Sequence, residues 1–289
     1  MPRRSVAVTL ACACAKIVHM TINVCIAGTT GWTGSVVTRH LMRSDEFTVV
    51  GALARTTAGR DLGEVLGLPA TGLSISETLD DVLAAGAKPD VLIDYTDPHS
   101  VKARTSQALA AGIRVVIGTS GLTAADYVEI EQAAIVMNLG VISAGNFSIT
   151  ATLAKHFALL AASFMPSWEI IDYASAGKVD VPSGTTQELA EALGQVAPSQ
   201  LGVALDAMHG PREARGATIG GTQVHSVRLP GFVIAFETIF GLPDERLTIR
   251  HDAGSSAEPY AVGTLLAAKK VMEITGLVRG LDQLLFTEP

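Results

Sequence analysis

The sequence INVCIAGTTGWTG at residues 22–34 decides the fold. An apolar, β-branched run ends in a turn with Gly28, Gly31 and Gly34 at every third position, and helical spacing begins directly afterwards. Such a turn lets backbone N–H groups approach nucleotide phosphates, and the following helix adds its positive dipole end. The spacing differs from G-x-G-x-x-G, which leaves a tight turn without a ligand as the alternative. We expect a dinucleotide site formed by Gly28, Thr30, Gly31, Trp32, Thr33 and Gly34.

Strands and helices alternate after this turn. Strands are expected at residues 22–27, 47–53, 91–94, 115–117 and 141–143, and helices at 35–42, 79–85, 101–110 and 124–137. Several strands are continuous apolar runs, which is typical of strands buried on both faces. The pattern predicts an α/β fold with a doubly wound, Rossmann-like parallel sheet.

The pattern changes after residue 146. Helices at 149–164 and 187–196 are expected there with strands at 169–173, 221–229, 233–240 and 246–251, and a last helix at 259–274. This predicts an α+β domain with a mixed or antiparallel sheet, with Phe157, Phe164 and Trp168 in its core. The expected division is a dinucleotide-binding domain at residues 20–145 and 255–289, and a substrate-binding and oligomerisation domain at 146–254.

Composition excludes several classes of protein. With 48% hydrophobic residues and a net charge of −7, the chain is neither disordered nor suited to nucleic acid or anionic membranes. The histidines and cysteines lack metal-ligand spacing, so no metal site is expected. Three cysteines do not make a disulfide framework, which predicts a cytoplasmic protein.

Residues 1–19 form an unusual leader. Arg3 and Arg4 precede an apolar run that resembles a short secretory signal. The alternative is an upstream translation start, with Met20 beginning the native protein directly before the first strand. We favour the second interpretation, because a protein that needs a cytosolic cofactor gains nothing from export.

The end of the second strand indicates the cofactor. NAD sites usually place an acidic residue there to hold the ribose 2′-hydroxyl, whereas this strand ends in Ala54, Arg55 and Thr56. Arg55 suits a 2′-phosphate, which favours NADPH, with NADH possible. The alternative is that Arg55 and Arg60 are solvated loop charges. Later strand ends should bring Tyr95, Thr96, Gly118, Thr119 and Ser120 to the nicotinamide half.

A second candidate site lies at residues 178–186, which read KVDVPSGTT. Hydroxyl groups around a glycine at a helix N-terminus can hold a carboxylate. Thr185 and Glu188 also have the spacing of a capping box, so a purely structural interpretation remains open.

The order of these motifs resembles the dihydrodipicolinate (4-hydroxy-tetrahydrodipicolinate) reductase family. The resemblance covers nearly everything after Met20 and rests on the glycine turn and on residues 94–96, 118–121, 144–148, 178–185 and 216–220. It implies a two-domain NAD(P)H enzyme, commonly a homotetramer assembled through the second sheet, that reduces a cyclic imine-type substrate of lysine and diaminopimelate biosynthesis. It also implies Asn146 and Phe147 beside the cofactor, Lys178 as the catalytic lysine, and a substrate-carboxylate cradle made by Ser183, Gly184 and Thr185.

The sequence departs from the family pattern before Lys178. The family typically has His-His-Arg-His there, whereas this chain has Ala174-Ser175-Ala176-Gly177. Basic residues are also frequent in the family at two further places, where this chain has Trp32 and Ser255-Ser256-Ala257. Two lost hydrogen bonds to charged groups would cost about 3–6 kcal/mol, or about 10²–10⁴-fold in transition-state binding.

These losses predict a reductase of the same build that acts on a less acidic, more apolar substrate at C=N or activated C=C. Lys178 is then the leading proton donor, and Tyr173 and Ser175 are hydroxyl candidates. Two alternatives stay open. One is a genuine dihydrodipicolinate reductase that tolerates the substitutions, and the other is a non-catalytic NADP-binding protein.

Overall fold

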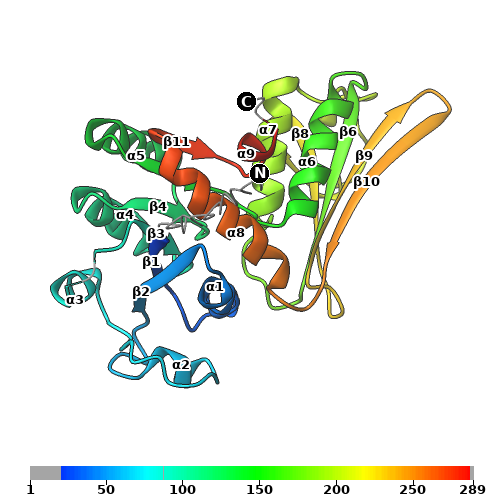
Figure 1. Ribbon diagram of the computed structural model, residues 1–289. Coiled ribbons are helices and arrows are strands. Elements are labelled where there is room, and N and C mark those ends of the chain that lie inside the picture. The colour runs from blue at the N-terminus through cyan, green and yellow to red at the C-terminus, as the bar shows by residue number, and fades with distance from the viewer. Residues whose placement is uncertain (1–20, 87, 287–289) are drawn as a thin grey trace, which may run out of the picture.

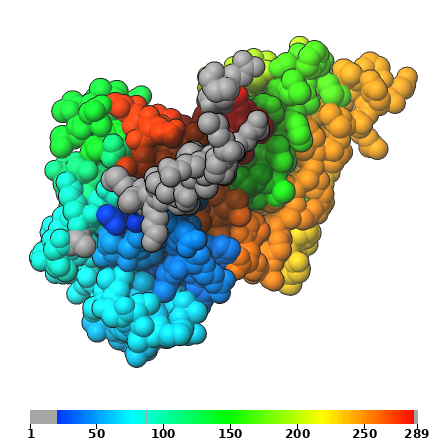
Figure 2. Space-filling model, in the orientation of Figure 1, coloured from blue at the N-terminus to red at the C-terminus, as the bar shows by residue number. Residues whose placement is uncertain are grey.

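The computed structural model describes residues 21–86 and 88–286, so the predicted leader and the proposed start at Met20 lie outside the described residues. Two sheets, each with its own helices, form two lobes (Figure 1). In the space-filling view, the first sheet and its helices make up the lobe at the left, and the second sheet lies at the right (Figure 2).

The first sheet has six strands in the order β11-β5-β4-β3-β1-β2. All its strand pairs are parallel. The strands are β1 (Ile22–Ala27), β2 (Phe47–Leu53), β3 (Val91–Asp94), β4 (Arg114–Ile117), β5 (Gly140–Ser143) and β11 (Gly276–Arg279). Every residue of β3 and β5 is buried, as expected for strands with helices on both faces. The predicted Rossmann-like sheet is confirmed, and β11 is a strand that the sequence analysis missed.

Helices cover both faces of this sheet. Helices α1 (Trp32–Arg43) and α8 (Glu258–Lys270) cover one face, where Leu41 and Ala267 join the β1 residue Ile26 in one apolar cluster. Helices α3 (Leu79–Ala84), α4 (Val101–Ala110) and α5 (Ala124–Met137) cover the other face and bury Leu109 and Ala134. A short helix, α2 (Leu62–Val65), packs beyond the β2 edge.

The second sheet is mixed, with the order β10-β9-β6-β8-β7. Its strands are β6 (Ser167–Ala174), β7 (Ala217–Ile219), β8 (Thr222–Arg228), β9 (Ile234–Leu242) and β10 (Glu245–Ala253). Strands β6 and β8 are parallel, and the other pairs are antiparallel. Helices α6 (Ile149–Ala162) and α7 (Gly184–Val196) cover one face, while the opposite face carries no helix of the described chain (Figure 1).

Two local predictions about this lobe were wrong. Helix α7 begins at Gly184 rather than at residue 187, because Ser183 is its N-cap and accepts a hydrogen bond from the Thr186 N–H. The capping box of Thr185 and Glu188 is therefore absent. Trp168 is buried as predicted, but Phe157 and Phe164 are 51% and 77% exposed on and just after α6, because that helix buries only its alanine-rich face.

Polar contacts join the two lobes near the point where the chain passes from the first lobe to the second. The Lys155 ammonium lies 2.6 Å from Glu188 of α7 and 2.8 Å from Asp282 of α9 (Asp282–Leu285). The other Glu188 oxygen accepts a hydrogen bond from the Gly145 N–H at the end of β5. Three 3-10 turns complete the described chain: Leu205–Ala207, Arg212–Arg215 and Val271–Glu273. Across residues 21–86 and 88–286, helices are too short or too polar to span a bilayer.

Candidate active site

Two cavities lie beyond the carboxyl ends of the first sheet's strands. The glycine-loop cavity, of about 260 Å³, includes Gly28, Thr30, Gly31, Arg55, Thr56 and Thr96 among its lining residues. The cleft cavity, of about 240 Å³, lies between the lobes. It collects most of the other predicted residues: Trp32, Thr33, Tyr95, Gly118, Ser120, Asn146, Phe147, Lys178, Ser183, Gly184 and Thr185.

The glycine turn has the geometry that nucleotide phosphates require. Gly28 has φ +84°, and a Cβ there would lie 2.2 Å from the Tyr95 carbonyl oxygen. A Cβ at Gly34 would lie 2.1 Å from the Gly28 carbonyl oxygen, so Gly34 lines neither cavity and instead allows close packing. Helix α1 starts without a side-chain cap, and the N–H groups of Trp32 and Thr33 have no hydrogen-bond partner among the described residues. These free donors fit a dinucleotide's phosphates.

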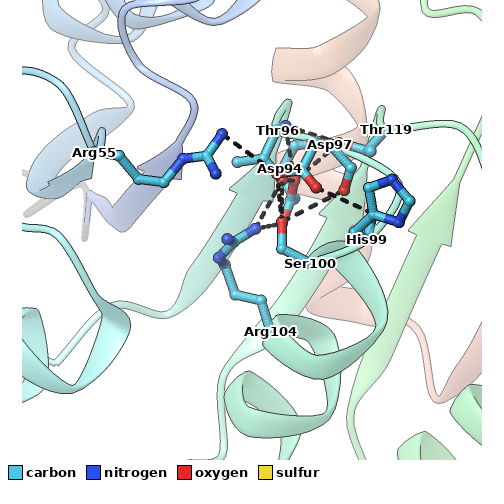
Figure 3. A network of polar contacts seen from close by, with 8 residues as sticks. All are labelled: Arg55, Asp94, Thr96, Asp97, His99, Ser100, Arg104 and Thr119. Atoms are coloured by element: carbon cyan, nitrogen blue, oxygen red, sulfur yellow. Dashed lines mark hydrogen bonds and ion pairs between the residues drawn. The ribbon is translucent and has the colours of Figure 1, made fainter.

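A buried carboxylate fixes the floor of the glycine-loop cavity (Figure 3). The side chain of Asp94, at the end of β3, is fully buried. It accepts hydrogen bonds from Thr96 Oγ1 at 2.6 Å and from Thr119 Oγ1 at 2.9 Å, and it pairs with Arg104 at 2.6 Å. Thr119 therefore lines neither cavity and instead holds the strand ends together.

Arg55 lies at the rim of the glycine-loop cavity. Its side chain is 81% exposed, and its guanidinium lies 3.9 Å from the Asp97 carboxylate (Figure 3). The hydrogen bond from Ser100 Oγ holds the pKa of Asp97 below its ordinary value. The sequence analysis missed Glu77, Asp97, Ser100 and Arg104 as lining residues of this cavity.

Aromatic side chains form the wall of the cleft cavity on the first lobe. Trp32 contacts the Tyr260 ring edge-on at 5.8 Å between centroids, and Tyr95 contacts Phe147 in the same way at 6.0 Å. The Tyr95 hydroxyl is paired with Thr264 Oγ1 at 2.6 Å, and burial raises the pKa of this phenol. Tyr95 therefore offers a ring surface rather than a free proton.

The opposite wall is the loop between β6 and α7. Lys178 Nζ lies 2.8 Å from the Asp180 carboxylate, and both residues line the cavity. The N–H groups of Gly184 and Thr185, in the first turn of α7, have no partner among the described residues. Asn146 Nδ2 donates a hydrogen bond to Thr185 Oγ1 at 3.1 Å, so the two lobes meet at this helix end. An ammonium and a free helix N-terminus on one wall can bind a carboxylate.

The side chain of Ser183 has a structural role. Its hydroxyl donates a hydrogen bond of 2.6 Å to Asp172, and its N–H donates another of 3.0 Å to the same carboxylate. Asp172 also pairs with Arg228 at 2.7 Å and is fully buried. Burial alone would raise the pKa of Asp172, but the bonds from Ser183 and Arg228 hold it below its ordinary value. The carboxylate cradle expected at residues 183–185 thus reduces to the backbone of Gly184 and to Thr185.

The structure does not bring Tyr173 or Ser175 into the cavity. Side chains alternate along β6, so Tyr173 points to the opposite face from Asp172, where it stacks on Phe232 and lies under Arg250. Ser175 is exposed in the turn after β6. We therefore assign neither residue a chemical role, which leaves Lys178 as the one predicted proton donor within the cavity.

Comparison with known proteins identifies the relatives of this chain. The family model described as dihydrodipicolinate reductase, N-terminus, matches residues 22–147, and the corresponding C-terminus model matches residues 147–285. The 4-hydroxy-tetrahydrodipicolinate reductase of Moorella thermoacetica is 40% identical over 92% of this chain and 98% of its own. That of Bacillus pumilus is 37% identical, with 92% and 99% coverage.

Solved structures agree with this result. The dipicolinate-bound dihydrodipicolinate reductase from Paenisporosarcina sp. TG-14 matches with a TM-score of 0.75 and 34% identity, covering 91% of this chain and 99% of that chain. An amine dehydrogenase from Mycobacterium smegmatis shares the fold at a TM-score of 0.64 and 16% identity, covering 91% of this chain and 96% of its own. The expectation of a different, less acidic substrate is contradicted, because relatives that match almost the whole chain are named as the ordinary reductase.

Proposed function

Because the chain belongs to the dihydrodipicolinate reductase family and is an NAD(P)H-dependent oxidoreductase, we propose that it is a 4-hydroxy-tetrahydrodipicolinate reductase. One observation carries the proposal. The cleft cavity joins the open end of the glycine turn, at Trp32 and Thr33, to Lys178 and the free first turn of α7. Such a cavity places an anionic substrate beside the nicotinamide end of a bound dinucleotide.

The dicarboxylate substrate is held by two kinds of donor. One carboxylate lies at the N-terminus of α7, where the Gly184 and Thr185 N–H groups and the helix dipole favour negative charge. The other carboxylate or the ring nitrogen faces Lys178, which is the cation among the lining residues of this cavity. Gly184 leaves room for the substrate, since a Cβ built there would come no closer than 3.9 Å to the Ser120 Cβ across the cavity.

The chemistry then depends on the side chains that line the cleft cavity. When bound, the coenzyme would supply a hydride to the electrophilic ring carbon, and the 4-hydroxyl group of the substrate would leave as water. Lys178 donates the proton to the ring nitrogen or polarises it, and Asp180 at 2.8 Å orients its ammonium group. The aromatic wall of Trp32, Tyr95 and Tyr260 limits access of water to this end of the cavity.

Three finer features belong to the same proposal. NADPH is the coenzyme that Arg55 favours, through a charge-assisted contact to the 2′-phosphate. A homotetramer forms through the face of the second sheet that no described helix covers, and Ile171, Tyr173 and Ile239 lie in alternate positions on that face. The enzyme works in the cytoplasm, where its coenzyme is available.

The test is turnover of 4-hydroxy-tetrahydrodipicolinate, generated in the assay by a synthase and followed by the absorbance of NADPH. We expect turnover that pyridine-2,6-dicarboxylate inhibits competitively, since this planar diacid fits the same carboxylate donors. Coenzyme binding without turnover would instead identify a non-catalytic NADP-binding protein. Absence of coenzyme binding would overturn the proposal altogether.

A further inference from the structure

The end of β2 carries no acidic residue, but a carboxylate from a different segment reaches the glycine-loop cavity. Dinucleotide sites that use NADH normally place an acid at the end of the second strand, where it accepts a hydrogen bond from the ribose 2′-hydroxyl. In this chain the positions after β2 are Ala54 and Arg55. Glu77 nevertheless lines the same cavity as Arg55, although 22 positions separate Arg55 and Glu77 in the sequence.

Backbone pairing puts Glu77 beside the end of β2. Ser76 forms a parallel bridge with Leu53 at the open edge of the sheet. The Ser76 N–H donates to the Ala52 carbonyl at 2.8 Å, and the Ala54 N–H donates to the Ser76 carbonyl at 3.1 Å. The residue that follows Ser76 therefore lies alongside Ala54, where a NADH site has its acid.

The residue on the other side of Glu77 is fixed as well. Thr78 is the N-cap of α3, and its hydroxyl donates to the Asp81 carboxylate at 2.6 Å in a capping box. Glu77 thus lies between Ser76, which is bridged to Leu53, and Thr78, which caps α3. Its backbone position is therefore defined. Its own carboxylate is exposed and makes no hydrogen bond or ion pair with any described residue, which leaves it free for a ligand.

The other carboxylate at this rim, that of Asp97, already has hydrogen-bond partners within the protein. Asp97 accepts hydrogen bonds from Ser100 Oγ at 2.8 Å and from the His99 N–H at 3.1 Å, and it faces Arg55 (Figure 3). These bonds are local ones that shape the start of α4. Glu77 is therefore the better placed of the two acids to accept a hydrogen bond from a ribose hydroxyl.

We infer that Glu77 and Arg55 together set the coenzyme preference, Glu77 by accepting a hydrogen bond from the 2′-hydroxyl of NADH and Arg55 by pairing with the 2′-phosphate of NADPH. The inference rests on the proposed coenzyme site and deepens it. A carboxylate repels the 2′-phosphate, so Glu77 also weakens NADPH binding while Arg55 strengthens it. The chain therefore accepts both coenzymes, and each residue acts against the other.

Direct titration of NADH and NADPH by calorimetry, without substrate and at low salt, tests this inference. Glu77→Gln should weaken NADH binding about tenfold, which equals about 1.4 kcal/mol, and should tighten NADPH binding about threefold. Arg55→Gln should weaken NADPH binding about tenfold with a smaller effect on NADH. Both changes should diminish as salt screens the charges.

Asp80→Asn is the matched control. Asp80 is exposed three residues further on, lies in the first turn of α3 and does not line the cavity. Its loss removes the same charge and should leave the ratio of the two affinities unchanged. An unchanged ratio in Glu77→Gln, or an equal shift in Asp80→Asn, would overturn the inference while leaving the coenzyme site intact. Failure of the unaltered chain to bind either coenzyme would overturn the proposed function instead.

Discussion

The Asp172 carboxylate lies 2.7 Å from the Arg228 guanidinium on the neighbouring parallel strand, and the same guanidinium nitrogen donates a 2.7 Å hydrogen bond to the Asp180 carbonyl. Asp172 also holds Ser183, the residue that caps α7. One buried ion pair thus fixes both the middle and the end of the loop that carries Lys178. The position of the Lys178 ammonium depends on a carboxylate that does not line the cavity.

Asp172→Asn should therefore damage both stability and catalysis. Removing one partner of a buried, hydrogen-bonded pair typically costs about 3–5 kcal/mol, because the other charge stays buried without compensation. We expect a loss of that size in urea unfolding, with a fall in kcat for the residual folded enzyme and an unchanged Kd for NADPH. Ser226→Ala removes a single 3.2 Å hydrogen bond to the same carboxylate and should cost about 1 kcal/mol. Equal effects of the two variants would contradict this assignment.

The same pair predicts a pH dependence of stability. The pKa of Asp172 is lower in the folded chain than its ordinary value, so the unfolded state binds a proton more readily. The stabilisation is complete above the unfolded pKa of about 3.9 and is lost as pH falls from there through the folded value. Unfolding free energy measured from pH 6 to pH 3 should fall less steeply in Asp172→Asn than in the unaltered chain. Parallel curves would show that another group titrates.

Lys178→Met should lower turnover at least tenfold with little change in NADPH affinity. The substitution keeps an unbranched side chain that is one atom shorter but removes the donor that the cavity offers to the substrate. Lys270→Met is the control, because Lys270 lies at the end of α8, pairs among the described residues only with exposed Glu273, and does not line the cavity. Full turnover in Lys178→Met would remove this lysine from the mechanism and would require another proton donor.

The sequence predicted features that depend on local pattern and missed those that depend on distant pairing. Helix α5 was predicted to its first and last residue, since the helical spacing on which the prediction rested is local; the structure adds a cap at Thr123, which is local as well. Glu77 was missed because it reaches its cavity only through the bridge of Ser76 with Leu53, which no local pattern encodes. Strand β11 is as short as β3, which was predicted, but it pairs with β5, 136 positions earlier in the sequence, and no local pattern encodes that contact.

Some of the errors had a signal in the sequence. Tyr173 was proposed as a hydroxyl donor, yet strict alternation along β6 places it on the face opposite to Asp172. The predicted substrate change followed from Ala174-Ser175-Ala176-Gly177, which stand where the family resemblance led us to expect His-His-Arg-His. That reasoning took the difference as a change of substrate, whereas relatives matched over most of the chain carry the name of the ordinary reductase.

Lys155→Met should destabilise the contact between the lobes. Lys155 is 13% exposed and lies between Glu188 and Asp282, whose charges raise its pKa against the opposing effect of burial. Its removal leaves two carboxylates facing each other, so we expect a loss of about 3–5 kcal/mol in urea unfolding. Lys102→Met removes a lysine that also contacts two carboxylates, but at the surface, and it should cause a much smaller loss. Equal losses would mean that Lys155 has no special role between the lobes.

The two tryptophans allow coenzyme binding to be assigned to the cleft. Trp32 is 51% exposed on the cleft cavity, whereas Trp168 is buried in the second lobe with its indole N–H bonded to Thr222 at 2.9 Å. A reduced nicotinamide beside Trp32 should quench its emission strongly. We therefore expect Trp168→Phe to retain most of the quenching produced by NADPH, and Trp32→Phe to lose most of it. If Trp32→Phe kept the full effect, the nicotinamide would lie elsewhere, and the placement of substrate between Lys178 and the first turn of α7 would fail with it.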